Sequence, residues 1–220
     1  MDIKPIKKSL TLKEQAYQAI KEAIYSNSLS PGTPLTEEQL SATLSISRTP
    51  IRSALQQLVY EKLAFKDTTG HIYVSKITPK DVHDASMLRS VLEPLAIDSA
   101  SFPVPKEYTD KLCRNYEAHI LLFQNEPDNN FRYAEMDYEF HCLLCQICDN
   151  DLLLEIVQNL NNIMIRIHIL SGTLNSHKQQ ALDEHAEIID YIKKGQKEFA
   201  KLAVEEHIRN VESRMFTQDN

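Results

Sequence analysis

Two stretches near the start of the chain decide its fold: residues 30–40 read SPGTPLTEEQL, and residues 47–55 read SRTPIRSAL. In the first stretch, Thr36 and Gln39 have the three-residue spacing of a capping box, which predicts that a short helix begins there. In the second, Ser47 is a typical N-cap residue. Apolar residues then recur at helical spacing at Ile51, Ala54, Leu55 and Leu58. This pattern predicts a second helix with one buried side.

The residues around these two helices complete a known arrangement of elements. An amphipathic helix is predicted over 11–27, because apolar residues recur there at three- and four-residue spacing. After the second short helix, residues 63–66 and 72–75 are β-prone and are separated by a turn that contains Gly70, which predicts a hairpin. A helix, a helix-turn-helix and a hairpin in this order are typical of a winged helix-turn-helix domain, which we expect over residues 1–77.

The exposed side of the second short helix is polar and basic. Arg48, Arg52 and Gln56 lie one turn apart, opposite the apolar stripe. A helix that enters the major groove of DNA needs outward polar side chains, and an arginine can bind guanine or phosphate through two hydrogen bonds. The alternative is that the two arginines only solvate a surface helix. The hairpin that follows favours the DNA-binding interpretation.

Composition and charge are those of a folded protein with two unlike parts. The 220 residues are 42% hydrophobic and 25% charged, and no apolar stretch reaches the roughly 18 residues that a membrane span needs. The net charge of −7 combines +3 over residues 1–77 with −10 over residues 78–220, which suggests that only the first part meets a polyanion. The charged N-terminus and the four cysteines argue against secretion, and we expect a cytoplasmic protein.

Residues 78–220 predict an all-α domain. A helix is expected to begin at Thr78, and further helices are expected over 106–124, 130–148, 151–170, 176–194 and 196–216. Helices that surround one core make a helical bundle. The predicted fold class is therefore mainly α, with an N-terminal winged helix-turn-helix and a C-terminal all-α helical bundle over 78–220.

Four residues of this second part have side chains suited to a divalent metal ion. Asp137 and His141 are four residues apart on one predicted helix, and His185 and His207 lie on two later helices. Carboxylate and imidazole groups that converge from three helices can bind Zn²⁺, Ni²⁺ or Mn²⁺. Alternatively, these imidazoles are buried groups with hydrogen-bond partners inside the bundle. His119 is expected at the surface or just behind these residues.

Two further features of the helical part each have two explanations. Arg89 lies on the apolar side of the first long helix, where burial is costly unless the guanidinium meets an anion. That anion is either a bound carboxylate or Glu93, four residues on. Cys142, Cys145 and Cys148 have the spacing of a metal motif, but they fan around a predicted helix. They are interpreted as small buried side chains.

The quoted stretches resemble the N-terminal domain of GntR-type bacterial transcription regulators. The Pro-Gly turn of residues 30–40, the Ser-Arg-Thr-Pro string of residues 47–55 and the wing glycine occur in the family's order. The resemblance implies a set of positions that contact operator DNA in the major groove, and two more at the wing tip near the minor groove. The first set is Ser47, Arg48, Thr49 and Arg52, and the second is Gly70 and His71.

Three positions depart from the usual pattern of that family. Ser45 and Lys62 stand where it usually has glycine, and Glu38 stands where a basic DNA-contacting residue is often found. The wing is also less basic than usual. Because affinity for DNA grows with the number of phosphates neutralised, these differences predict weaker or more salt-sensitive binding.

The helical part is similar to the all-helical, FCD-type effector domain of the FadR-like branch of the same family. The similarity rests on residues 88–96, 137–141, 184–189 and 206–208. In metal-binding members, an Asp-x-x-x-His pair and two later histidines hold one cation. The resemblance implies that the ligands here are Asp137, His141, His185 and His207. It also implies that Arg89 faces the cavity beside the metal, where small carboxylates bind.

Together these features predict a ligand-responsive DNA-binding regulator that is not an enzyme. We expect a homodimer that places two winged helices on a double-stranded operator and acts as a repressor. A small carboxylate or sugar acid, bound beside the metal, is expected to control it. One alternative is a metal-dependent enzyme acting on a small carboxylate, but Glu139 and Glu184 are expected to point away from the ligands. Another is a regulator whose helical domain only dimerises.

Overall fold

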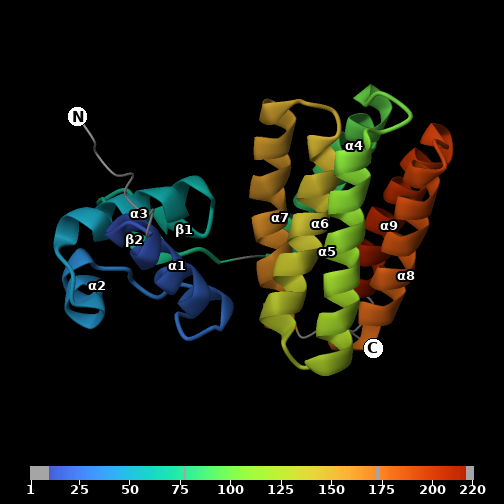
Figure 1. Cartoon of the computed structure of the whole chain (residues 1–220). Coiled ribbons are helices and arrows are strands. Elements are labelled where there is room, and N and C mark those ends of the chain that lie inside the picture. Colours follow the sequence, from blue (N-terminus) through green and yellow to red (C-terminus); the bar gives the residue numbers. More distant parts are fainter. Residues whose placement is uncertain (1–9, 77, 172–173, 217–220) are drawn as a thin grey trace, which may run out of the picture. The chain divides into compact units, whose positions relative to one another are not determined.

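The computed structural model describes residues 10–76, 78–171 and 174–216 of the chain. The chain divides into two compact units, residues 1–76 and residues 77–220 (Figure 1). Helices make up most of the described chain, and the described strands form one two-stranded sheet. The expected fold class is confirmed: mainly α, with a winged helix-turn-helix followed by a helical bundle.

The first unit combines short helices with a hairpin. Its elements are α1 (Leu12–Tyr25), α2 (Glu37–Leu44), α3 (Arg48–Tyr60), β1 (Ala64–Lys66) and β2 (Ile72–Val74). Helices α1 and α2 both pack against α3. The core that they enclose is apolar and buried, and it contains Ile20, Leu35, Ile51, Leu55, Leu58, Leu63 and Val74.

The ends of the two short helices depend on particular residues. The hydroxyl of Thr36 caps α2, accepting a hydrogen bond from the backbone N–H of Gln39, while the Gln39 side chain accepts from that hydroxyl, so only the first half of the expected capping box is formed. Ser45 and Lys62, which follow α2 and α3, have φ of 55° and 61°, a conformation that glycine adopts without strain. Ser47 lies at the N-cap position of α3, but its side chain makes no capping hydrogen bond, which corrects the expectation for that residue.

The hairpin forms the wing of this unit. Strands β1 and β2 pair antiparallel over their whole length. At the tip, the Asp67 carboxylate accepts hydrogen bonds from the backbone N–H groups of Thr69 at 2.9 Å and His71 at 2.8 Å. Gly70 has φ of 96°, which its missing side chain permits. The exposed tip is therefore held in a defined turn.

The second unit is a ring of helices. Its elements are α4 (Pro79–Ser99), α5 (Lys106–Asn125), α6 (Asn130–Gln146), α7 (Asp151–Ser171), α8 (Leu174–Lys193) and α9 (Lys197–Phe216). Neighbouring helices pack in the order α4, α9, α8, α5, α6, α7, and α7 packs against α4 to close the ring (Figure 1). None of the described helices is long and apolar enough to cross a membrane.

A layer of polar side chains interrupts the apolar core of this bundle. On α4, buried apolar residues precede and follow the buried pair Arg89 and Glu93. On α6, α8 and α9, the buried residues His141, His185 and His207 likewise lie among apolar core residues. Because polar groups are costly to bury, such a layer in the middle of a core points to a binding site.

Candidate DNA-binding and metal-binding sites

The start of α3 presents the residues that the sequence assigns to DNA. The exposed residues there are Ser47, Arg48, Thr49 and Arg52, and Gly70 and His71 are exposed at the wing tip. The side chain of Arg48 is 62% exposed, and its Nη2 lies 3.7 Å from Oε1 of Glu38. An exposed ion pair of this length contributes little stability. Arg48 is thus accessible to an external partner.

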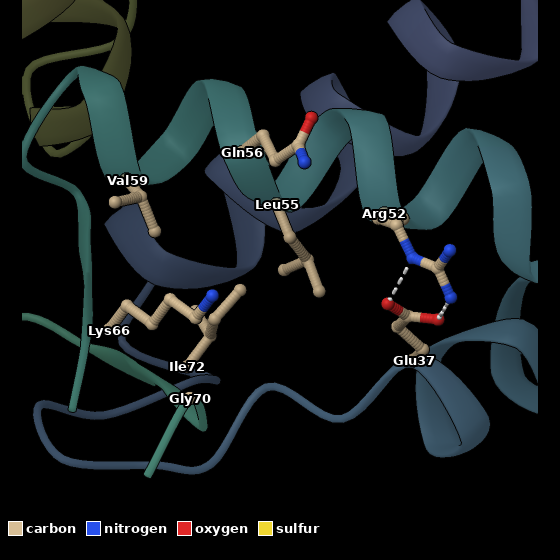
Figure 2. Close-up of a pocket in the computed structure, with 8 residues that line it drawn as sticks. All are labelled: Glu37, Arg52, Leu55, Gln56, Val59, Lys66, Gly70 and Ile72. Carbon is tan, nitrogen blue, oxygen red and sulfur yellow. Dashed lines mark hydrogen bonds and ion pairs between the residues drawn. The ribbon is translucent and has the colours of Figure 1, made fainter. Parts of the chain in front are cut away.

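Arg52 is held much more firmly than Arg48. Its Nε and Nη2 donate hydrogen bonds of 2.7 and 2.8 Å to the two carboxylate oxygens of Glu37, in the first turn of α2 (Figure 2). The hydrogen bond from Arg52 lowers the pKa of the Glu37 carboxyl, and the same bond raises the pKa of Arg52. A bidentate pair of this kind fixes the plane of the guanidinium as well as its position.

A pocket of about 270 Å³ lies between α3 and the wing. Its lining includes Arg52 and Gln56 of α3 and Lys66 and Gly70 of the hairpin, which are labelled in Figure 2. Two cationic groups and an amide at one concave surface suit phosphate oxygens and base edges. The sequence predicts Arg52 and Gly70 at this surface but not Glu37, which pairs with Arg52 from another helix.

Three buried imidazoles meet in the polar layer of the helical bundle. His141 of α6, His185 of α8 and His207 of α9 offer ligand atoms that all lie within 4.8 Å of one another. Nε2 of His207 is 3.3 Å from Nε2 of each of the other two rings. The Asp137 carboxylate oxygens lie 3.6 Å from His185 Nε2 and 3.9 Å from His141 Nε2. The four residues assigned to the metal by sequence are thus neighbours in space.

Two glutamates fix the orientation of two of these rings. Glu93 Oε2 lies 2.6 Å from His141 Nδ1, and Glu184 Oε2 lies 2.7 Å from His207 Nδ1. Burial raises the pKa of Glu93, but Arg89 and His141 outweigh it and hold the pKa at about 2. Burial is likewise outweighed at Glu184, where the hydrogen bond from His207 helps to hold the pKa at about 2. Because an ionised carboxylate only accepts, each Nδ1 donates, and each Nε2 faces the cluster, where a neutral ring offers its lone pair.

The position of Glu184 corrects a prediction. As the neighbour of His185, it is expected from sequence to point away from the metal ligands. In the structure it reaches α9, where it accepts hydrogen bonds from His207 Nδ1 at 2.7 Å, from Asn210 Nδ2 at 2.9 Å, and from Arg214 Nη2 at 2.7 Å. The side chains of neighbouring residues on one helix do point in different directions, but Glu184 contacts His207, a proposed metal ligand on another helix.

Arg89 lies in the same layer, with 2% of its surface exposed, and its charge is paired inside the protein. Its Nε donates to Glu93 Oε1 at 2.6 Å, so the internal ion pair that the sequence allows is formed. Nη2 of Arg89 is buried and has no hydrogen-bond partner among the residues that the structure describes. An unsatisfied donor on a buried charged group is costly, so this atom is suited to an anionic ligand.

His119 of α5 also belongs to the polar layer. It is fully buried, and its ring centroid lies 4.0 Å from that of Tyr133 and 6.2 Å from that of His185. Burial lowers the pKa of His119 to about 4, so the ring is neutral at neutral pH. A surface position is therefore wrong for His119, and it lies behind His185. The helical spacing of Leu112, Asn115 and His119, all buried on α5, is the sequence signal for this.

Cys142 and Cys145 of α6, and Cys148 two residues beyond its end, are not arranged as metal ligands. Cys142 and Cys145 are buried, Cys148 is half-buried, and none of these three forms a disulfide. Burial raises the pKa of Cys142 to about 12, which disfavours the thiolate that metal binding requires. These observations confirm the interpretation of Cys142 and Cys145 as small buried side chains and correct it for Cys148, which is only partly buried.

The donor set of the imidazole cluster fits a divalent metal ion. Two nitrogens that bind one Zn²⁺ at about 2.0–2.1 Å in a tetrahedral arrangement lie about 3.3–3.4 Å apart. The Nε2 atoms of His207 and His141 are 3.3 Å apart, and in neutral rings whose Nδ1 carries the proton their lone pairs face each other. Such lone pairs repel unless a positive group lies between them. Imidazole nitrogens together with a carboxylate are ligands that zinc, nickel and manganese all accept.

Comparisons with known proteins assign each of the two units to a family of protein domains. Residues 12–74 match the family described as bacterial regulatory proteins, gntR family, and residues 84–210 match the FCD domain. The transcriptional repressor RspR of Escherichia coli K12 is 26% identical over 210 residues, covering 94% of this chain and 91% of that protein. The uncharacterized regulator YdhC of Bacillus subtilis 168 is 27% identical over 196 residues, covering 89% and 87%.

A solved structure has the same fold. A GntR transcriptional regulator from Rhodococcus sp. RHA1 superposes with a TM-score of 0.80 at 17% identity, covering 94% of this chain and 99% of that one. The FCD match alone spans more than half of the chain. The resemblance seen in the sequence is therefore confirmed: the chain belongs to the gntR family of bacterial regulatory proteins, carries an FCD domain, and is a ligand-responsive DNA-binding transcription regulator.

Proposed function

We propose that the protein is a repressor whose affinity for its operator is controlled by a small carboxylate or sugar acid bound beside a divalent metal ion. One observation carries this proposal. Glu93 joins the buried Arg89, whose Nη2 lacks a partner in the described part of the chain, to the imidazole cluster. A buried cationic donor next to a cluster of metal-binding groups suits a ligand with anionic oxygens.

The proposed metal ligands are Asp137, His141, His185 and His207, and the ion is zinc, nickel or manganese. When bound, the ion supplies positive charge that attracts a carboxylate. The chain contributes orientation, because Glu93 and Glu184 hold the rings of His141 and His207 with Nε2 turned inward. Arg89 is the proposed effector-binding residue, and its planar guanidinium matches a carboxylate.

The proposed DNA contacts lie on the first unit. Ser47, Arg48, Thr49 and Arg52 of α3 enter the major groove, and Gly70 and His71 of the wing approach the minor groove. All of these residues are exposed. The carboxylates of Glu37 and Glu38 stand beside the two arginines, so fewer positive charges act on the phosphates than in a fully basic interface.

We propose a homodimer in which α4 and α7 form the interface. Large apolar side chains on α4 are exposed by 45–62% at Met87, Leu88, Val91 and Leu95, which share one side of the helix. Helix α7, which packs against α4, exposes Leu152 by 66% and Ile156 by 40%. Exposed apolar residues gathered on neighbouring helices suit contact with a second copy. Two copies present two winged helices to the half-sites of an operator.

We propose that the metal ion helps to bind the effector and does not take part in catalysis. A metal-dependent enzyme needs a general base within reach of its substrate. Glu184 is engaged by His207, Asn210 and Arg214, and Glu139 accepts a hydrogen bond from Asn115 at 3.2 Å. These contacts favour regulation over turnover. Action as a repressor is proposed because RspR, similar over most of its length, is named a repressor. Because its partner is chromosomal DNA, we expect the protein in the cytoplasm.

The proposal is tested in two steps. First, the purified protein selects duplexes from a random pool, and the enriched sequence serves as its operator. Second, small carboxylates and sugar acids are screened by thermal shift on zinc-loaded and zinc-stripped protein, since a ligand of the native state raises Tm. We expect an acid that raises Tm only of the loaded protein and alters operator affinity. If no sequence is enriched, or if the acids raise Tm equally with and without zinc, the proposal is contradicted.

A further inference from the structure

We infer that Glu93 couples the metal-binding histidines to the effector-binding arginine, so that each ligand strengthens binding of the other. The inference rests on the proposed function, because it assigns a positioning residue between its two binding groups. Glu93 is 0% exposed and uses one oxygen for each partner. Oε1 accepts from Arg89 Nε at 2.6 Å, and Oε2 accepts from His141 Nδ1 at 2.6 Å.

The shared carboxylate makes these two hydrogen bonds depend on each other. Hydrogen bonds that meet at one buried group polarise one another, because the low local dielectric screens them weakly. With a cation held at its Nε2, His141 would be a stronger donor from Nδ1–H and would draw the charge of Glu93 toward its ring. The hydrogen bond that Glu93 accepts from Arg89 would then weaken, and more of the guanidinium charge would be available to an external carboxylate.

The reverse effect follows from the same geometry. A carboxylate that binds Arg89 takes up part of its positive charge, so Glu93 interacts more strongly with His141 and makes its Nε2 a better ligand. Thermodynamic linkage requires the two effects to be equal in free energy. The coupling is therefore positive in both directions, and Arg89 changes metal affinity although it is not itself a metal ligand.

Glu184 provides a matched comparison within the same site. It has the same relation to His207 that Glu93 has to His141, with a 2.7 Å hydrogen bond to Nδ1. Its other partners are Asn210 and Arg214 of α9, and its side chain is 21% exposed at the edge of the bundle. Arg89 donates to Glu93. Glu184 therefore orients a proposed metal ligand, as Glu93 does, but it is not part of the hydrogen-bonded connection between the histidines and Arg89.

The test measures Zn²⁺ affinity by competition with a chromophoric chelator. Glu93→Gln and Glu184→Gln are each expected to weaken zinc binding by about 10–100-fold, because both orient a ligand. Arg89→Gln is expected to tighten zinc binding by about threefold or more in the wild-type and Glu184→Gln backgrounds. In the Glu93→Gln background, the effect of Arg89→Gln is expected to be lost. The double variant removes both buried charges together, which helps it to fold.

A second measurement covers the case in which Glu93→Gln does not fold. In zinc-loaded protein, the imidazole Nδ1–H resonances of His141 and His207 are compared between wild type and Arg89→Gln by NMR. Glu93 contacts His141 directly, whereas His207 shares only the zinc ion, so we expect the His141 resonance to move more than that of His207. The inference is overturned if the two resonances move equally or neither moves, or if Arg89→Gln acts equally in all three backgrounds. A wild type that binds no zinc overturns the metal site of the proposed function as well.

Discussion

Glu37 at the start of α2 holds Arg52 of α3 through two hydrogen bonds of 2.7 and 2.8 Å. The two helices of the helix-turn-helix are thus joined at the surface proposed to contact DNA. The pair has two opposing effects on DNA binding. It fixes the direction of a base-contacting or phosphate-contacting group, and it places a negative charge beside the DNA phosphates.

Substitution of Glu37 separates these effects, with Glu38 as the matched control. Glu37→Gln is expected to raise affinity for random duplex and to reduce the preference for the selected operator, because the guanidinium of Arg52 loses its fixed direction. Glu38→Gln removes the same charge beside Arg48, where the separation is 3.7 Å, and is expected to raise both affinities in parallel. Fluorescence anisotropy measures the affinity for operator and for scrambled duplex, and the ratio of these two affinities gives the sequence preference. Equal ratios for the two variants would disprove the positioning role of Glu37.

The assignment of Arg48 to the major groove makes a separate prediction. Arg48→Ala is expected to weaken operator binding by about 1–3 kcal/mol and to relax preference at one base position. Because Arg48 is exposed, thermal stability is expected to stay within about 0.5 kcal/mol of wild type. A binding curve that does not change would remove Arg48 from the interface, whereas a uniform loss on all duplexes would make it a phosphate contact.

The metal site predicts zinc-dependent stability. Zinc at about 100 times its Kd is expected to stabilise the wild type by about 2.7 kcal/mol, because it binds only the folded state. The gain is expected to disappear in Asp137→Ala and His185→Ala. His83→Ala is the control, since His83 is an exposed histidine on α4 that pairs with Glu212. Calorimetry of loaded and stripped proteins measures the effect, and equal gains in all variants would exclude Asp137 and His185 as ligands.

The proposed interface predicts a change of oligomeric state. Val91→Asp introduces a charge on the exposed apolar side of α4 and is expected to give a monomer, because burying an unpaired charge between two copies is costly. Leu121→Asp is the control, since Leu121 of α5 is also exposed, by 57%, outside α4 and α7. Light scattering with size exclusion gives the mass. A dimer that survives Val91→Asp, or a wild type that is monomeric, would refute this interface.

Helical periodicity is sufficient to predict the helices of the fold, because it reflects which side of each helix is buried. The spacing around Arg89 correctly predicts that this charged residue lies on the inward side of α4, and the ion pair with Glu93 is one turn away. Ser45 and Lys62 were visible as departures from a glycine pattern. Their left-handed conformation explains why that pattern exists.

Helical periodicity does not predict the contacts between segments that are distant in the sequence. Glu93 and His141 are 48 residues apart, and Glu184 and His207 are on different helices. Periodicity gives the side of a helix but not its rotation against a neighbour, so it cannot pair these groups. The absence of a capping bond at Ser47 is a similar case, because hydroxyl orientation depends on local geometry that a residue preference does not contain.

The most direct test of the account is operator affinity measured with zinc and the acid that raises Tm most. We predict that this acid weakens operator binding by the zinc-loaded wild type about tenfold or more, in line with ordinary allosteric coupling energies. Zinc-loaded Arg89→Gln is expected to bind the operator normally and to ignore the acid. An acid that binds the wild type without changing its operator affinity, or that acts equally on Arg89→Gln, would contradict control through this site.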